Sequence, residues 1–350
     1  TGSTGSSFLQ TINPLTTVPS MVSLPLHRSN ALEDSGVQHD AGVQHGAGSR
    51  TILVARRCGR LANRLVLAAN IMAYAQDRQW QAYDPTLYTY AEYFEQLKNN
   101  VFYRFPAPEV PQRWARLAHP LMRTKCGYHV VRHTSHLVES VPGLSSLACT
   151  ISEPADGTVL DLDSPGFAEA CGRASLIFLR GWLIRASQSV ARHGDDVRRY
   201  FRPAGAYRTQ AENRVDALRQ HNDVVVGVHI RQGDYRTWLN GKYYFPTAYY
   251  LRWMRSLAAT FENQRVGFLI CGDEPHHERE FDGLSVCCHG GHFIEDLYAL
   301  SCCDFLLGAQ STYSQWASFY GKVPMLHVRR ADDPVELSRF RVSNLEFLPY

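Results

Sequence analysis

The most regular pattern along the chain is an alternation of short apolar runs with segments of helical periodicity. Four nearly continuous apolar runs occur at residues 224–230, 266–271, 304–309 and 324–328. Runs of this length and composition are typical of strands that are buried on both faces of a parallel sheet. The segments between them, at 247–261, 295–303 and 311–320, predict helices, so we expect right-handed βαβ units in this half of the chain.

A second unit of the same kind begins near residue 50. TILVA at 51–55 predicts a buried strand, and the basic, glycine-containing turn RRCGRLA at 56–62 follows it. Asn63 is expected to cap a helix whose apolar residues recur every three or four positions through about Trp80. A strand, a loop and a helix in this order typically open a nucleotide-binding or glycosyltransferase half-domain.

The chain divides into three parts. Residues 1–49 are rich in Ser, Thr and Gly and contain the repeat GVQHDAGVQHGAG, which predicts a flexible tail. A loop at 202–210 is the expected boundary between an N-terminal Rossmann-like domain, 50–205, and a C-terminal one, 206–350. Two such α/β halves that face each other across a cleft would bind a ligand at the carboxyl ends of their strands.

Composition narrows the class of protein. The 350 residues are 45% hydrophobic and 20% charged, with a net charge of +3, which allows a sizeable core and argues against a nucleic-acid-binding surface. No apolar run approaches the roughly 18 residues of a membrane span, and the first residues lack the pattern of a signal peptide. We therefore expect a cytoplasmic protein, while a lumenal enzyme of the secretory pathway without its anchor would have the same composition. The nine cysteines are expected to be free thiols, several of them buried.

The apolar run at 224–230 leads into the residues with the clearest chemistry. His229 and Arg231 lie two positions apart and therefore point to one face of the strand end. Gly233 permits a sharp turn, after which Asp234 can fold back toward the backbone or toward Arg231. Two interpretations follow for Arg231: it forms fork-like hydrogen bonds to a diphosphate at this edge of the sheet, or it pairs with Asp234 as an internal strut.

The same segment is similar to a known family signature. HIRQGDY, at His229–Tyr235, resembles the His-x-Arg-Arg-Gly-Asp-Tyr signature of α1,2-fucosyltransferases (glycosyltransferase family 11), which α1,6- and protein O-fucosyltransferases share in looser form. Three more segments resemble the family in the right order, namely CGRLANR at 58–64, FLICGDE at 268–274 and EDLYALSCCDFLLGAQSTYSQWAS at 295–318. The chain departs from the family at Ala62, at Arg64 and at Gln232, which replaces the second arginine and removes a positive charge from the expected donor site.

The resemblance implies a GT-B-like fold, with GDP-fucose bound mainly by the second half, transfer with inversion, and no metal or other cofactor. Arg231 matches the arginine that contacts the β-phosphate in the family, and it is the expected catalytic residue. Ser311 and Thr312, at a helix N-terminus, are expected either to donate to the same phosphates or only to cap the helix. Asp296 would contact the nucleoside, and His229 would contact the base or ribose or else brace the loop.

The other half is expected to supply the acceptor side. Gly59, Arg60 and Asn63 would face the donor site and touch the reacting sugar or the acceptor. No catalytic base is assigned, because Asp234 is expected to be structural and Asp273, at a strand end, has either a donor-site role or a turn role. The expected acceptor is a hydroxyl of a glycan, with a protein Ser or Thr as the alternative.

Three rival interpretations remain open. Asp161 and Asp163, in VLDLDS, form an Asp-x-Asp that could hold Mn²⁺ in a metal-dependent glycosyltransferase of the other common fold. A zinc protein is a second possibility, although no Cys-x₂-Cys pair occurs. The zinc candidates are Cys287, Cys288, His289, His292, Cys302 and Cys303. His39 and His45 of the tail repeat suggest a separate metal site, which two histidines of a flexible segment rarely form. Third, the chain could bind a nucleotide-sugar or a glycan without turnover, because Gln232 replaces an arginine.

Overall fold

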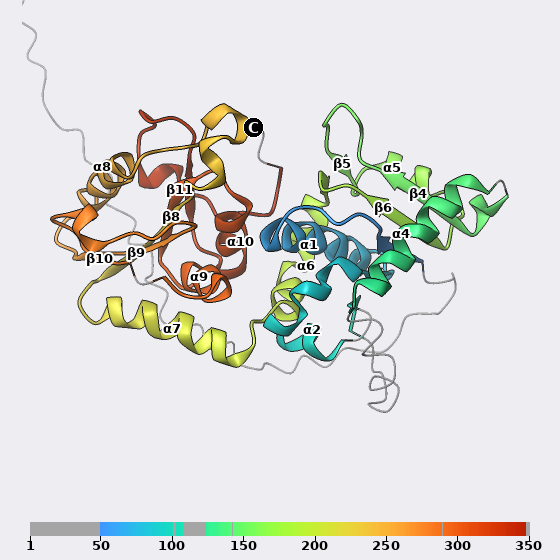
Figure 1. The fold of residues 1–350 in the computed structure, drawn as a ribbon, viewed down its shortest axis with the longest axis horizontal. Helices are drawn as coiled ribbons and strands as arrows, with labels where there is room; N and C mark the ends of the chain where they lie inside the picture. The colour runs from blue at the N-terminus through green and yellow to red at the C-terminus, as the bar shows by residue number, and fades with distance from the viewer. Residues whose placement is uncertain (1–49, 101–102, 108–123, 142, 289, 348–350) are drawn as a thin grey trace, which may run out of the picture. The chain divides into compact units, whose positions relative to one another are not determined.

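The computed structural model describes residues 50–100, 103–107, 124–141, 143–288 and 290–347 (Figure 1). The tail predicted at 1–49, which contains His39 and His45, lies outside the described residues. The zinc candidate His289 lies outside them as well.

The N-terminal half is built on a five-stranded sheet (Figure 1). Its strand order is β3-β2-β1-β6-β4, and the strands in that order are Arg104–Phe105, Gln81–Tyr83, Thr51–Val54, Leu176–Arg180 and Ala148–Ser152. All neighbours are parallel except β2 and β3. The strand predicted at 51–55 is therefore confirmed, and it is the central strand of this sheet. A separate parallel pair joins β5 (Leu160–Asp161) to β7 (Ile184–Arg185).

Helix α1 (Leu61–Asp77) follows β1 and is buried along nearly its whole length. The prediction of Asn63 as its cap was wrong, because the helix already includes this residue and Arg60 takes the cap position. The periodicity, whose first apolar residue is Leu61, agrees with the observed start, and Gly59, with φ of +59°, makes the turn that precedes it. The other helices of this half are α2 (Glu95–Asn99), α4 (Lys125–Ser140), α5 (Pro165–Cys171) and α6 (Ser187–Tyr200).

The C-terminal half is a second five-stranded sheet, parallel throughout, as predicted. Its order is β10-β9-β8-β11-β12, and the strands in that order are Ser285–Cys287, Val266–Gly272, Val224–Ile230, Phe305–Ala309 and Met325–Val328. Its helices are α7 (Gly205–Arg219), α8 (Thr247–Ala258), α9 (Phe293–Leu300) and α10 (Thr312–Gly321). The loop predicted at 202–210 is helical from Gly205 onward, so that prediction was wrong over most of its length, and the domain boundary placed there stays a prediction.

The strand order of the C-terminal sheet contains one reversal. The chain proceeds from β8 to β9 and β10 on one side, then returns to β11 and β12 on the other side of β8. In open parallel sheets, ligands bind outside the carboxyl ends of the strands at such a switch point. The switch point lies between β8 and β11, and the segments that leave these two strands contain the signature residue Arg231 and the helix start at Ser311.

The largest hydrophobic core contains residues of both halves. The ring of Trp316 on α10 lies edge-on to that of Phe201, which follows α6, with centroids 5.4 Å apart. The hydroxyl of Tyr298 on α9 donates to the backbone oxygen of Phe201 at 2.7 Å. A second core packs α8 against the other face of the C-terminal sheet. Helices and loops of the two halves therefore stabilise each other through shared burial.

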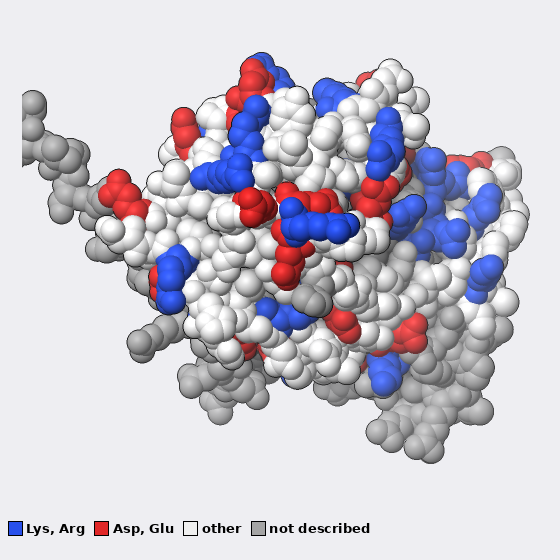
Figure 2. All heavy atoms as spheres, turned by 60° about the vertical axis from the view of Figure 1, so that its left-hand side comes forward, with Lys and Arg blue, Asp and Glu red and all other residues white. Residues whose placement is uncertain are grey.

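The surface is mixed in charge. Figure 2 shows acidic and basic side chains next to one another on one face of the described chain. Many surface arginines form ion pairs, such as Arg236 with Glu274 at 2.6 Å and Arg265 with Asp223 at 3.2 Å. Cys271 is a buried free thiol, as predicted. Within the described ranges, no helix has the length and apolar character needed to cross a membrane.

Candidate functional site at the end of strand β8

Arg231 is the first residue after β8, and two groups fix its side chain. Its Nε and Nη2 donate to Oδ1 and Oδ2 of Asp234 at 2.9 and 2.7 Å. Its guanidinium also lies 5.0 Å from the ring centroid of Tyr235, whose hydroxyl donates to the backbone oxygen of Gln310 at 2.6 Å. The pairing with Asp234 is thus present, and it occupies two of the five N–H donors of the guanidinium. The other three have no protein partner among the described residues, and 19% of the side chain is exposed.

Asp234 is committed to this arginine. The hydrogen bond from Arg231 lowers the pKa of the Asp234 carboxyl, and the positive charge of Arg60 lowers it further. A carboxylate with a lowered pKa is a weak proton acceptor, which agrees with a structural role. Arg60 comes from the loop between β1 and α1, so charges from both halves act on this carboxylate.

Asp273, after β9, holds the signature loop in place. Its Oδ1 accepts hydrogen bonds from the backbone N–H groups of Gln232 at 2.8 Å and Gly233 at 3.3 Å. Gly233 has φ of −48°, so positive φ is not the reason for a glycine. A Cβ at this position would lie 3.0 Å from Oδ2 of Asp273, and the glycine allows this close approach. Of the two roles open to Asp273, the structure supports the turn.

The Gln232 side chain is engaged by the protein backbone. It is buried, and its Nε2 donates to the backbone oxygen of Phe245 at 2.8 Å. The fork of Arg231 and Asp234 forms without any contribution from this side chain. Gln232, in place of the family's second arginine, was expected to remove a positive charge from the donor site. In the structure, the side chain at this position is buried in the protein interior.

His229, inside β8, is a buried, neutral imidazole. Its ring stacks on Tyr313 of α10, with centroids 4.8 Å apart. Burial, together with the charge of Arg231, lowers the pKa of His229 to about 3. Its Nδ1 is buried without a partner among the described residues, so a polar atom is available beside the signature arginine. Burial and the neighbouring His229 likewise lower the pKa of His327 on β12 to about 3.

A pH dependence of stability follows from His229. Between its folded pKa of about 3 and an unfolded pKa of roughly 6.5, the unfolded chain binds a proton that the folded chain does not. The free energy of unfolding should therefore fall as pH drops from 6 to 4, by up to about 1.4 kcal/mol per pH unit for this one group. Urea titrations of the wild type and His229→Phe should give a shallower pH dependence for the variant. Parallel curves would mean that His229 is protonated in the folded state.

The start of α10 is the second wall of the site. Gly308 on β11 pairs with His229 on β8, so two residues further along Gln310 comes opposite Arg231. The next residue, Ser311, caps α10 as predicted, its hydroxyl accepting from the N–H of Tyr313 at 3.2 Å. The N-terminus of such a helix carries a partial positive charge and is favourable to phosphate.

Thr312 connects the two halves directly. Its hydroxyl donates to Oδ1 of Asn63 on α1 at 2.5 Å. Gly59 packs directly against Asn63, and this position requires a glycine because a Cβ there would lie 2.1 Å from the Asn63 side chain. Arg64 braces the same loop, with its Nη1 donating to the oxygen of Thr86 at 2.7 Å and its Nη2 to the oxygen of Gly59 at 3.3 Å. Arg64 is therefore a buried support of the loop that presents Arg60 and Asn63.

Asp296 is largely occupied by other contacts. Its Oδ1 lies 2.5 Å from Nη1 of Arg214 on α7 and accepts from the N–H of Gly291 at 3.2 Å. The side chain is mostly buried, which favours such an ion pair over a solvated carboxylate. A contact with the nucleoside stays a prediction, and the contacts present hold the loop that precedes α9.

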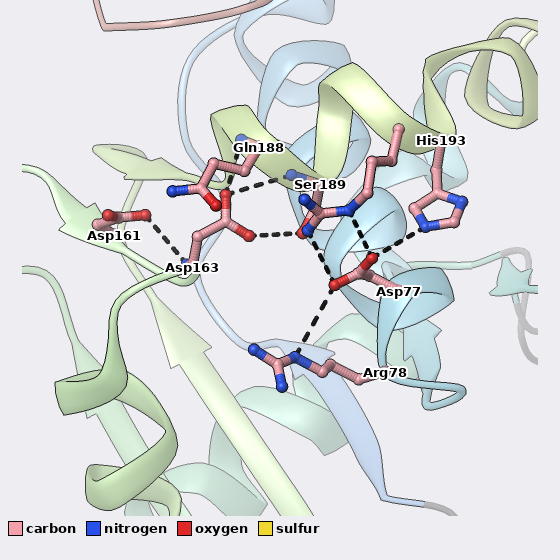
Figure 3. A network of polar contacts seen from close by, with 8 residues as sticks. Asp77, Arg78, Asp161, Asp163, Gln188, Ser189 and His193 are labelled. Carbon is pink, nitrogen blue, oxygen red and sulfur yellow. Dashed lines mark hydrogen bonds and ion pairs between the residues drawn. The ribbon is translucent and has the colours of Figure 1, made fainter.

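The Asp-x-Asp pair serves local structure. Asp163 accepts from the hydroxyl of Ser189 at 2.5 Å and from the N–H of Gln188 at 2.8 Å, at the first turn of α6 (Figure 3). Asp161 accepts from the N–H of Asp163 at 3.0 Å. Figure 3 shows that these carboxylates point to the helix start and to their own turn, with Asp77 in a neighbouring network. Helix capping accounts for Asp163 without a metal.

The zinc candidates do not form a cluster. Across the part of the chain that the structure describes, no group of three or more His, Cys, Asp or Glu side chains is placed to hold a metal ion. His292 instead caps α9, with its Nδ1 accepting from the N–H of Ile294 at 3.4 Å. Cys303 is buried in the core, where burial raises the pKa of its thiol.

Three site residues were not singled out from the sequence. The ring of Tyr313 stacks on His229, the ring of Tyr235 lies 5.0 Å from the guanidinium of Arg231, and burial and His229 together lower the pKa of His327. Two of them could have been found from the sequence. Tyr235 lies inside the family-like signature, and His327 is a polar residue within an apolar run. Tyr313 had no such signal, because a tyrosine in the first turn of a helix is as typical of a core as of a site.

Comparison with known proteins places the fold. No protein-family model and no curated protein matches the chain. A mutant of FUT1 from Arabidopsis thaliana in complex with GDP aligns with a TM-score of 0.51 and 12% identity, over 87% of this chain and 75% of that chain. Fucosyltransferase NodZ from Bradyrhizobium aligns with a TM-score of 0.48 and 14% identity, over 80% and 96% of the two chains. POFUT1 in complex with GDP aligns with a TM-score of 0.45 and 10% identity, over 81% and 98%. The chain therefore shares the α/β, GT-B-like fold of Arabidopsis FUT1, which confirms at the level of the fold the fucosyltransferase resemblance of its motifs.

Proposed function

We propose that the chain is an inverting, metal-independent glycosyltransferase that moves fucose from GDP-fucose to a hydroxyl of a glycan. The observation that carries the proposal is Arg231, whose three remaining N–H donors have no partner among the described residues and which follows β8 at the switch point of the sheet. The fold shared with Arabidopsis FUT1, whose structure contains GDP, supports this donor.

The proposed chemistry follows from charge. Transfer breaks the bond between fucose C1 and the β-phosphate oxygen and forms a bond from C1 to the acceptor oxygen, which loses its proton. Negative charge develops on the departing GDP, so a fixed cation beside it stabilises the transition state more than the ground state. Arg231 needs no rearrangement for this role, because Asp234 and Tyr235 already hold it. Arg60 and Asn63, next to the same loop, would contact the reacting sugar or the acceptor.

Nucleotide selectivity tests the donor. Titration of the purified protein by calorimetry in EDTA should show GDP binding at least about tenfold tighter than UDP or ADP, a difference of about 1.4 kcal/mol. Binding that prefers UDP, or that requires Mn²⁺, would contradict the proposal and favour the Asp-x-Asp interpretation. Release of fucose from GDP-fucose by the protein alone would then distinguish an enzyme from a protein that only binds the nucleotide-sugar.

A further inference from the structure

A basic pocket lies in the N-terminal half, next to the loop that carries Arg60. Its volume is about 330 Å³. It is lined by four basic and two aromatic side chains, namely Arg57, Lys125, His129, Arg132, Tyr88 and Tyr128. The lining residues come from the β1–α1 loop, from a short turn after β2, and from α4. They are therefore far apart in sequence and meet only in the folded chain.

One face of α4 supplies three of the four basic residues. Lys125, His129 and Arg132 are spaced by four and three positions, so they lie on the same side of the helix. The one acidic residue of α4, Glu139, forms an ion pair with Arg180 at 2.8 Å. Among the described residues no carboxylate pairs with the charged residues of the pocket, whereas arginines elsewhere on the surface are commonly paired. The pocket is thus a local excess of positive charge that the protein does not neutralise.

The two tyrosines fix the fourth basic residue, Arg57. The Tyr128 hydroxyl accepts from the backbone N–H of Arg57 at 3.3 Å, and the Tyr88 hydroxyl accepts from its Nη1 at 3.4 Å. The second of these bonds uses one of the guanidinium donors and leaves the rest for a ligand. Arg57 is exposed, and its charge lowers the pKa of the nearby Arg64, after the larger effect of burial.

The pocket is close to the proposed reaction site. Arg57 and Arg60 are three residues apart on one loop, so their Cα atoms are separated by no more than about 11 Å. Asn63, three residues after Arg60, accepts a hydrogen bond from Thr312 at the start of α10. The loop that lines the pocket therefore continues into the segment that contacts the second wall of the proposed site.

From this arrangement we propose that the pocket binds a negatively charged group of the acceptor, and that the acceptor is an acidic glycan. The inference rests on the proposed glycosyltransferase function and specifies its substrate class. Arginine and lysine recognise carboxylate, sulfate and phosphate groups. Tyrosine rings beside the cations suit a carbohydrate, since their flat faces can cover a sugar ring.

Binding of defined oligosaccharides in the absence of donor tests this proposal. The probes are tetragalacturonate, which carries carboxylates, a heparin tetrasaccharide, which also carries sulfates, and neutral cellotetraose. Calorimetry at 50 mM salt should show at least one acidic probe binding tenfold or more tighter than cellotetraose, and the tighter of the two identifies the anionic group. Equal affinities for the neutral and both acidic probes would overturn the proposal.

A matched pair of variants separates the pocket from overall charge. Lys125→Ala with Arg132→Ala removes two positive charges from the pocket and should abolish the preference for the acidic probe. Arg173→Ala with Arg329→Ala removes two charges at exposed side chains outside it and should preserve the preference. Equal losses in both variants would mean non-specific attraction and sink the proposal. GDP affinity is measured in parallel and should match the wild type in both variants, which would show that both fold. If the wild-type protein itself did not bind GDP, the proposed function would be refuted instead.

Discussion

Replacing Arg231 with alanine is expected to lower kcat by roughly 10²–10³, by analogy with the loss of one transition-state donor. The side chain has three N–H donors left to offer a diphosphate, and it stands at the switch point where an anionic ligand binds in this class of sheet. The measurement is the initial rate of fucose release from GDP-fucose, or of transfer once an acceptor is known. GDP affinity should fall as well, because the same donors contact the ground-state diphosphate.

Two further variants make this test specific. Arg236→Ala removes an exposed arginine of the same loop that pairs with Glu274 and lies over Tyr244, so it should leave GDP affinity and rate close to wild type. Asp234→Asn keeps the size of the side chain but removes the charge that orients Arg231, and should give an intermediate loss. If Arg231→Ala bound GDP as well as Arg236→Ala does, Arg231 would be only an internal strut.

The strands were predictable because a strand that is buried on both faces appears in the sequence as a nearly continuous apolar run. VVVGVHI could be placed as β8 from composition alone, and it is the strand that is wholly buried at the centre of its sheet. Helix limits were harder. The cap of α1 was misplaced because Asn63 is a good capping residue by type, yet its side chain accepts a hydrogen bond from Thr312, 249 positions away in sequence.

The site was predictable only where neighbours in sequence are neighbours in space. The fork between Arg231 and Asp234 spans three residues, so the sequence could suggest it. The partner of Asp296 is Arg214 on another helix, and the partner of Gln232 is the backbone of Phe245, and neither leaves a local pattern. The same holds for the basic pocket, whose members are assembled from three separate segments.

Trp316→Ala is expected to lower the free energy of unfolding by about 3–5 kcal/mol. Trp316 belongs to the C-terminal family-like motif, yet it is fully buried, with its ring 5.4 Å from that of Phe201 and 5.5 Å from that of Phe319. Removing the indole leaves a cavity in the core that both sheets share, which adds to the lost transfer free energy. Urea unfolding followed by circular dichroism measures the effect, and Trp316→Phe, which retains a ring, should lose less. A Trp316→Ala variant that unfolds like the wild type but no longer binds GDP would contradict this assignment and make Trp316 a donor-site residue.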